Sequence, residues 1–190
     1  MRIIAGQHKG RRLTAPSGRN TRPTSDKARG AVFNVISHAP WAPPIEGALV
    51  LDLFAGSGAL GLEALSRGAA YAMFVDNDAS ARRAIETNVR DLRLDDKARL
   101  DRRSATRLGP RPSFTEQAFN LVFIDPPYHK GLVLPALQAL LTKDWVSADA
   151  LVVVETASDE TTDFTDWTIC DARTYGAAKI HFLSPDVSAT

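Results

Sequence analysis

The sequence lacks most of the features that mark secreted, membrane and metal-binding proteins. Cys170 is its one cysteine, which excludes an intrachain disulfide and a cysteine-based metal cluster. No apolar run approaches the ~20 residues of a membrane span, and the first residues form no apolar signal core. The four histidines are scattered without a ligand spacing. We therefore expect a cytoplasmic protein with no metal and no membrane partner, and we take it to be a monomer.

An excess of charge of either sign is also missing, because the net charge of the 190 residues is only +1. That value argues against a nucleic-acid partner, but the charge is unevenly distributed. Residues 1–29 carry eight basic residues and one acidic residue, giving +7, so the remainder carries −6. We predict a basic, hairpin-like N-terminal arm over residues 1–23 and one domain over residues 24–190. A solvated tail without a partner is the alternative interpretation of the arm.

From residue 48 onward, short apolar runs alternate with amphipathic segments. This alternation predicts an α/β fold, a Rossmann-like, mostly parallel sheet of seven strands. A helix is expected to begin after Thr24. The expected strands are Ala48–Phe54, Tyr71–Val75, Ala98–Asp101, Phe119–Ile124 and Leu151–Val154, followed by an antiparallel hairpin of Trp167–Cys170 and Lys179–Leu183. The expected helices between them are Leu60–Arg67, Ser80–Leu94 and Leu132–Leu141.

A glycine-rich loop follows the first predicted strand. Gly56, Gly58 and Gly61 satisfy the G-x-G-x-x-G pattern of nucleotide-binding loops, and Asp76 ends the next strand, where an acid can accept ribose hydroxyls. NAD would place a pyrophosphate over this loop. Asp52 lies just ahead of the loop, and its carboxylate instead suits S-adenosylmethionine (AdoMet), which carries an ammonium and a sulfonium. The run from Asp52 to Gly58 resembles motif I of class I methyltransferases.

A second motif, Asp125-Pro126-Pro127-Tyr128, follows the strand Phe119–Ile124 directly. The prolines fix the backbone and leave carbonyl acceptors free, while Asp125 adds a carboxylate. Two rigid acceptors can hold both hydrogens of an exocyclic amine, and Tyr128 offers a face for a flipped base. These four candidate catalytic residues resemble motif IV of methyltransferases that act on the amino groups of adenine, cytosine or guanine.

Together with these motifs, three N-terminal stretches extend the resemblance: residues 1–6, residues 9–13 and residues 22–29. The sequence resembles the 16S rRNA guanine-N2 methyltransferase family that modifies guanine 966 of the small ribosomal subunit, from Met1 to about Val154. The resemblance implies AdoMet as cofactor and, as partner, 16S rRNA within the small subunit or an assembly intermediate. Gly30 departs from the family pattern, which has a glutamate there, and this predicts a looser arm.

The resemblance also implies roles for individual residues. The positions that would bind the methionine part of the cofactor are Asp52, Phe54, Ala55, Gly56, Ser57 and Gly58. Asp76 would bind the ribose, and Asn77, Ser104 and Ala105 would lie at the adenine. The segment that contains Thr24 would close over the bound cofactor. The RNA-binding positions are Arg2, Lys9, Arg11, Arg12, Arg22 and Arg29. Three alternatives stay open: a DNA adenine-N6 methyltransferase, a small NAD-dependent oxidoreductase and a non-catalytic RNA-binding assembly factor.

Overall fold

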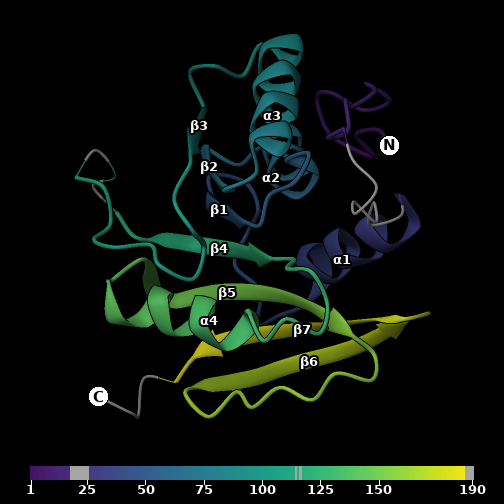
Figure 1. Cartoon of the computed structure of the whole chain (residues 1–190). Helices are drawn as coiled ribbons and strands as arrows, with labels where there is room; N and C mark the ends of the chain where they lie inside the picture. The colour runs from purple at the N-terminus through teal and green to yellow at the C-terminus, as the bar shows by residue number, and fades with distance from the viewer. Residues whose placement is uncertain (18–25, 114, 116, 187–190) are drawn as a thin grey trace.

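The computed structural model describes residues 1–17, 26–113, 115 and 117–186 (Figure 1). Seven strands form one sheet in the order β3-β2-β1-β4-β5-β7-β6. The strands are β1 (Leu49–Leu53), β2 (Tyr71–Val75), β3 (Ala98–Asp101), β4 (Phe119–Ile124), β5 (Val146–Ala157), β6 (Trp167–Tyr175) and β7 (Ala178–Pro185). The first five strands are parallel, and β7 is antiparallel to both β5 and β6, as the sequence predicts.

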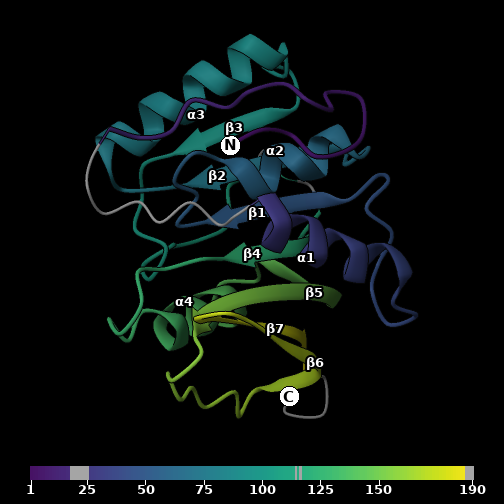
Figure 2. The same cartoon turned by 90° about the vertical axis from the view of Figure 1, so that its right-hand side faces the viewer.

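In the described ranges, four helices cover the two faces of this sheet. They are α1 (Asp26–His38), α2 (Ala59–Ser66), α3 (Ala79–Leu92) and α4 (Val133–Thr142). Side chains alternate along each strand, so Val50 packs with α1, α2 and α3, whereas Leu51 and Leu53 pack with α4. Figure 2 shows α1 and α4 on opposite sides of β4 and β5. In the described part of the chain, no helix combines the length and apolar character needed to cross a membrane.

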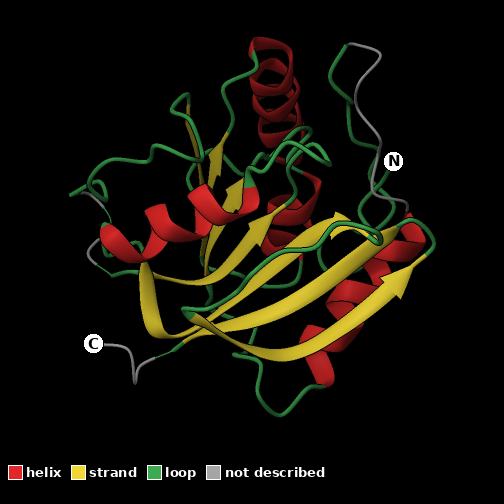
Figure 3. Ribbon diagram, turned by 60° about the horizontal axis from the view of Figure 1, so that its bottom comes forward, coloured by secondary structure: helices red, strands yellow, loops and turns green. Residues whose placement is uncertain are grey.

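The C-terminal strands are longer than the sequence predicts. The strand expected at Leu151–Val154 extends over Val146–Ala157, and the one expected at Trp167–Cys170 continues to Tyr175. Figure 3 shows these long strands side by side at one edge of the sheet. Polar residues such as Ser147 and Glu155 interrupt the apolar pattern, but β5 hydrogen-bonds to β4 and β7 and therefore stays extended.

The N-terminal segment folds back on itself and packs against the body. Arg2 and Arg12 form an isolated antiparallel bridge, and the amide of Ile3 donates to the carbonyl of Arg11 at 2.9 Å. Ile3 and Leu13 are buried in the same apolar cluster as α1, α2 and α3. Figure 2 shows this segment running across α2 and α3. The predicted boundary between residues 23 and 24 lies outside the described residues.

Candidate active site

Three aspartates lie at the carboxyl edge of the sheet. The register places the last residue of β1 opposite the last residues of β2 and β4. Asp76 directly follows β2 and Asp125 directly follows β4, so they lie on either side of β1, which carries Asp52 as its last residue but one. Carboxyl ends of parallel strands are where ligands bind in α/β folds. The sequence-predicted acids of both motifs therefore meet at one edge.

The loop between β1 and α2 turns sharply through left-handed backbone conformations. The φ angles are 57° at Phe54, 57° at Gly56 and 75° at Gly58, which precedes α2. Phe54 is not a glycine, and a strained backbone at such a position is typical of binding sites. Gly61 serves a different purpose, because a Cβ there would lie 2.5 Å from the ring of Phe74. This glycine allows α2 to approach the sheet closely.

Asp52 is a buried carboxylate beneath this loop, with a side chain almost inaccessible to solvent. Its Oδ2 accepts a hydrogen bond from the amide of Gly61 at 2.9 Å. Burial raises the pKa of Asp52 well above its usual range, and the negative charges of Asp125 and Asp76 raise it further. A cationic ligand would relieve this excess of negative charge. The ammonium and sulfonium of AdoMet fit this requirement, whereas a pyrophosphate does not.

Asp76 ties the glycine loop to the end of β2. Its Oδ2 accepts from the amide of Gly56 at 2.8 Å, and its Oδ1 accepts from the amide of Asp78 at 2.8 Å. Burial is the main cause that raises the pKa of Asp76. Each carboxylate oxygen keeps a further lone pair, which suits the ribose hydroxyls expected at this position. Asn77 lies next to it and is exposed.

The predicted adenine-side residues follow β3. The hydroxyl of Ser104 lies 3.0 Å from that of Thr106, so it already has a partner. The methyl group of Ala105 is buried in the core on the α4 face, and a ligand contact at Ala105 would therefore be made by its backbone. The predicted cover, Thr24, lies outside the described residues.

The Asp-Pro-Pro-Tyr segment begins where β4 ends. The amide of Asp125 donates to the carbonyl of Leu53 at 3.4 Å, which ties the start of the segment to the end of β1. Pro126 is buried and Pro127 is exposed. The hydroxyl of Tyr128 donates a hydrogen bond to the carboxylate of Glu155 on β5. The segment therefore lies beside the glycine loop, with its aromatic ring held from the neighbouring strand.

The arm brings four of the predicted RNA-binding side chains to the surface. Lys9 and Arg12 are exposed. Arg2 is also exposed and lies 3.4 Å from the carboxylate of Asp26, while Arg11 donates to the carbonyl of Asp91 on α3 at 2.7 Å. The fifth predicted residue, Arg22, lies outside the described residues.

The prediction for Arg29 is wrong, because its side chain is completely buried. The guanidinium donates to the carbonyl of Arg2 and to the carboxylate of Asp26, the latter at 3.0 Å, and its Nε lies 4.0 Å from the carboxylate of Glu63. Arg29 thus fastens the arm to α1 and α2. The run of basic residues over residues 1–29 gave no sign that the side chain of Arg29 faces inward.

Two residues beside the site were missed by sequence reasoning. Asn88 on α3 is buried; its Oδ1 accepts from the amide of Thr14 at 2.7 Å, and its Nδ2 donates to the carbonyl of Ser57 at 2.9 Å. It therefore joins the arm to the glycine loop. Glu155 is the other, and a signal for it exists, since it directly follows the apolar run Leu151–Val154 and so falls at the same edge of the sheet as Asp125.

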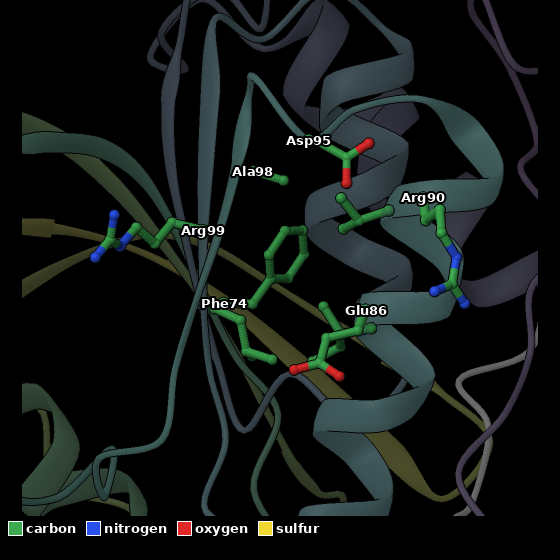
Figure 4. Close-up of a pocket in the computed structure, with 9 residues that line it drawn as sticks. Phe74, Glu86, Arg90, Asp95, Ala98 and Arg99 are labelled. Atoms are coloured by element: carbon green, nitrogen blue, oxygen red, sulfur yellow. The ribbon is translucent and has the colours of Figure 1, made fainter.

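A pocket between α3 and the edge strand β3 lies outside this site (Figure 4). The ring of Phe74 points into it, whereas Arg99 points to the other side of β3 and Arg90 points outward from α3. None of the residues that line it is one of the predicted cofactor, catalytic or RNA-binding residues.

The sheet order with its antiparallel β7, the glycine loop and the buried Asp52 define a class I methyltransferase that uses AdoMet. The chain belongs to the family described as "Conserved hypothetical protein 95", whose model matches residues 1–184. The assignment as an AdoMet-dependent methyltransferase argues against a small NAD-dependent oxidoreductase as the interpretation of the glycine motif.

Named relatives and solved structures agree with this assignment. The chain is 41% identical over 156 residues to "Putative rRNA methyltransferase YlbH" of Bacillus subtilis, covering 82% of each chain. It is 37% identical over 155 residues to "Ribosomal RNA small subunit methyltransferase D" of Escherichia coli, covering 82% of this chain and 74% of the relative. Among solved structures, "Putative methyltransferase yhhF" from Escherichia coli matches with a TM-score of 0.80, 34% identity and 98% coverage of both chains.

Proposed function

We propose that this methyltransferase transfers the methyl group of AdoMet to the exocyclic N2 of a guanine in 16S rRNA, at position 966 of the small ribosomal subunit. The observation that carries the proposal is the position of the Asp-Pro-Pro-Tyr segment, at the end of β4 and next to the glycine loop. The family resemblance of the motifs supports the target position, and the names of the relatives support rRNA as the substrate class.

In this proposal, the chain holds the cofactor with the loop between β1 and α2. The buried carboxylate of Asp52 and the backbone around Gly56 and Gly58 bind the methionine part, and Asp76 accepts the ribose hydroxyls. When bound, AdoMet supplies an electrophilic methyl group on a sulfonium. The residues of the chain bind and orient this group; much of the rate enhancement then comes from orientation.

The target amine is held by two acceptors, the carboxylate of Asp125 and the carbonyl of Pro126. Each accepts one hydrogen of the guanine amine, and Tyr128 stacks on the flipped base. The nitrogen attacks the methyl carbon in line, so an N–C bond forms while the C–S bond breaks. The nitrogen becomes cationic as the bond forms, and the two acceptors stabilise that charge. The extra proton then leaves to Asp125 or to water, and S-adenosylhomocysteine is the other product.

The basic arm supplies the contact to the rRNA backbone in this proposal. The arm packs directly on α2 and α3. It carries four exposed basic side chains: Arg2, Lys9, Arg11 and Arg12. Each phosphate neutralised by such a cation makes binding more dependent on salt concentration. The arm therefore adds positive charge to the surface over α2 and α3.

The proposal is tested by incubating the protein with AdoMet and small subunits that lack the modification, followed by mass spectrometry of the digested 16S rRNA. We expect one methyl group on N2 of guanine 966. Asp125→Ala should reduce the rate by roughly 100-fold or more, because one of the two acceptors for the developing charge is lost. Asp149→Asn removes an exposed carboxylate at the other end of β5 and should leave the rate unchanged.

Three outcomes would contradict the proposal. Methylation of adenine N6 in DNA, with no methylation of the subunit, would favour a DNA methyltransferase. RNA binding without methyl transfer would favour the non-catalytic assembly factor. Full activity of Asp125→Ala would remove the assigned role of the motif.

A further inference from the structure

The Tyr128 ring is held from outside its own segment. Tyr128 lies four residues beyond the end of β4, and its hydroxyl donates to the carboxylate of Glu155. Glu155 directly follows Val154, which pairs with Ile124, the last residue of β4. A side chain from the next strand of the sheet therefore reaches back to the tip of the motif.

The two ends of this contact differ in how firmly the backbone is fixed. Glu155 lies in β5 between β4 and β7, and it pairs with Ile180 of β7. Tyr128 lies in a connecting segment in which His129 and Gly131 adopt left-handed conformations, with φ angles of 56° and 61°. Glu155 thus anchors a loop residue to the sheet.

A second carboxylate supports the same segment. The amide of His129 donates to Oε2 of Glu160 at 3.2 Å, and Glu160 lies just after β5. With the hydroxyl of Tyr128 bound to Glu155, the segment is held at two successive residues by the end of β5. The ring of Tyr128 is consequently fixed at its Cβ end by the backbone and at its hydroxyl end by a carboxylate.

We infer that Glu155 is a positioning residue for methyl transfer, holding the Tyr128 ring in place so that a flipped base meets a preformed stacking surface. This inference rests on the proposed function, because it takes the substrate to be a base that leaves its stack. A side chain that is ordered beforehand loses less conformational entropy when the ligand binds. Glu155 acts through Tyr128 and needs no contact of its own with the substrate.

The chemistry of the contact gives a graded set of variants. Glu155→Gln keeps a carbonyl oxygen that can accept from the phenol, whereas Glu155→Ala removes the acceptor. Tyr128→Phe keeps the aromatic face and removes the donor. The double variant, Tyr128→Phe with Glu155→Ala, tests whether the two side chains act through one contact. Asp149→Asn on the same strand serves as the control for the loss of one carboxylate.

The experiment measures kcat and the KM for RNA at saturating AdoMet, together with the Kd for AdoMet and the melting temperature of each variant. We expect Glu155→Ala to raise the KM for RNA by about 3- to 10-fold, the range that loss of one ordered side chain gives. The Kd for AdoMet should not change. Glu155→Gln should restore a KM within about twofold of the wild type.

A second readout does not depend on catalysis. An RNA fragment carrying 2-aminopurine at the target position reports base stacking on Tyr128 through the quenching of its fluorescence. Glu155→Ala and Tyr128→Phe should reduce this quenching equally, and the double variant should reduce it no further. Additive effects, a wild-type KM for Glu155→Ala, or a Gln variant as impaired as the Ala variant would each overturn the inference.

The failure of the inference and that of the proposed function are distinguishable. If the wild-type protein methylates a different base, the proposed target is wrong, and the variants are then compared on that base. If the wild type methylates guanine N2 and all Glu155 variants match it, the target holds and the positioning role is wrong.

Discussion

Asp52 carries an unfavourable charge until a cation binds beside it. Burial of its carboxylate raises its pKa, and the negative charges of Asp125 and Asp76 raise it further. The folded protein therefore holds the Asp52 proton more tightly than the unfolded chain does. The contribution of Asp52 to the free energy of unfolding therefore decreases as the pH rises from the ordinary pKa of an aspartate toward the raised pKa of the folded state.

We predict that Asp52→Asn stabilises the cofactor-free protein at neutral pH and weakens AdoMet binding. An asparagine still accepts the hydrogen bond from the amide of Gly61 and carries no charge to bury. The loss of a charged partner should weaken AdoMet binding by roughly 10- to 100-fold. Thermal unfolding with and without AdoMet, and calorimetric titration with AdoMet, measure the two effects.

The pH dependence checks the physical reason for that prediction. At a pH below about 3.8 the aspartate is protonated in both states, so the melting temperatures of the two proteins should converge. The melting temperature of Asp52→Asn should exceed that of the wild type by an amount that grows as the pH rises. An advantage that shrinks with rising pH would show that burial of charge at residue 52 is not its cause.

At the scale of elements, α1 contains one residue that opposes helix formation. Gly30 lies inside α1, where a glycine costs conformational entropy, and a Cβ at this position would lie 3.7 Å from the Cδ1 of Ile4 in the arm. That distance is an ordinary van der Waals contact. The arm is docked in spite of this glycine, because Glu63 accepts hydrogen bonds from the amides of Ile4 and Ala5 at 2.7 and 3.0 Å.

We predict that Gly30→Ala raises the free energy of unfolding by about 0.5–1 kcal/mol. The melting temperature should rise by roughly 2–4 °C per kcal/mol for a protein of this size. Gly109→Ala is the matched control, and it should lower the free energy of unfolding. Gly109 has a φ of +66°, which an alanine adopts only with strain. A lower melting temperature for Gly30→Ala would mean that Ile4 cannot accommodate the added methyl group.

The sequence predicts the parallel strands well because each is a short apolar run with a turn after it. Tyr71–Val75 and Phe119–Ile124 are found with the predicted bounds. The length of β5 is underestimated because Asp149 and Glu155 are polar. Glu155 is extended because it pairs with Ile180 of β7, and Asp149 lies where the β4–β5 register shifts. The glycine loop and the Asp-Pro-Pro-Tyr segment are each continuous in sequence, so the sequence alone is enough to recognise both motifs. Asn88 and Thr14 are 74 residues apart, and no local pattern connects them.

At the scale of the whole molecule, the arm and the glycine loop share one residue. Asn88 is almost fully buried and uses its side-chain amide to bind the backbone of Thr14 and the carbonyl of Ser57. Removing this side chain leaves the buried carbonyl of Ser57 without its partner, which costs about 1–3 kcal/mol, and it releases the backbone of the exposed Thr14. The position of the arm and the shape of the loop are therefore coupled.

We predict that Asn88→Ala lowers the melting temperature, weakens AdoMet binding and exposes the arm to protease near Thr14. Limited proteolysis followed by mass spectrometry locates the cleavage, and calorimetry gives the affinity. Asn34→Ala, at an exposed position of α1, is the control and should change none of the three. Faster cleavage of the arm with unchanged AdoMet affinity would show that the loop keeps its shape without the arm.

The docking of the arm has a consequence for how the chain is made. Its hydrogen-bond partners on α2 and α3 lie 58 to 80 residues further along the sequence. At a synthesis rate of about 5–20 residues per second, the arm waits roughly 3–16 seconds before these partners exist. During that interval its cationic residues remain undocked beside the translating ribosome, itself rich in RNA phosphates. Attachment of the arm is thus a late event in the biogenesis of this protein.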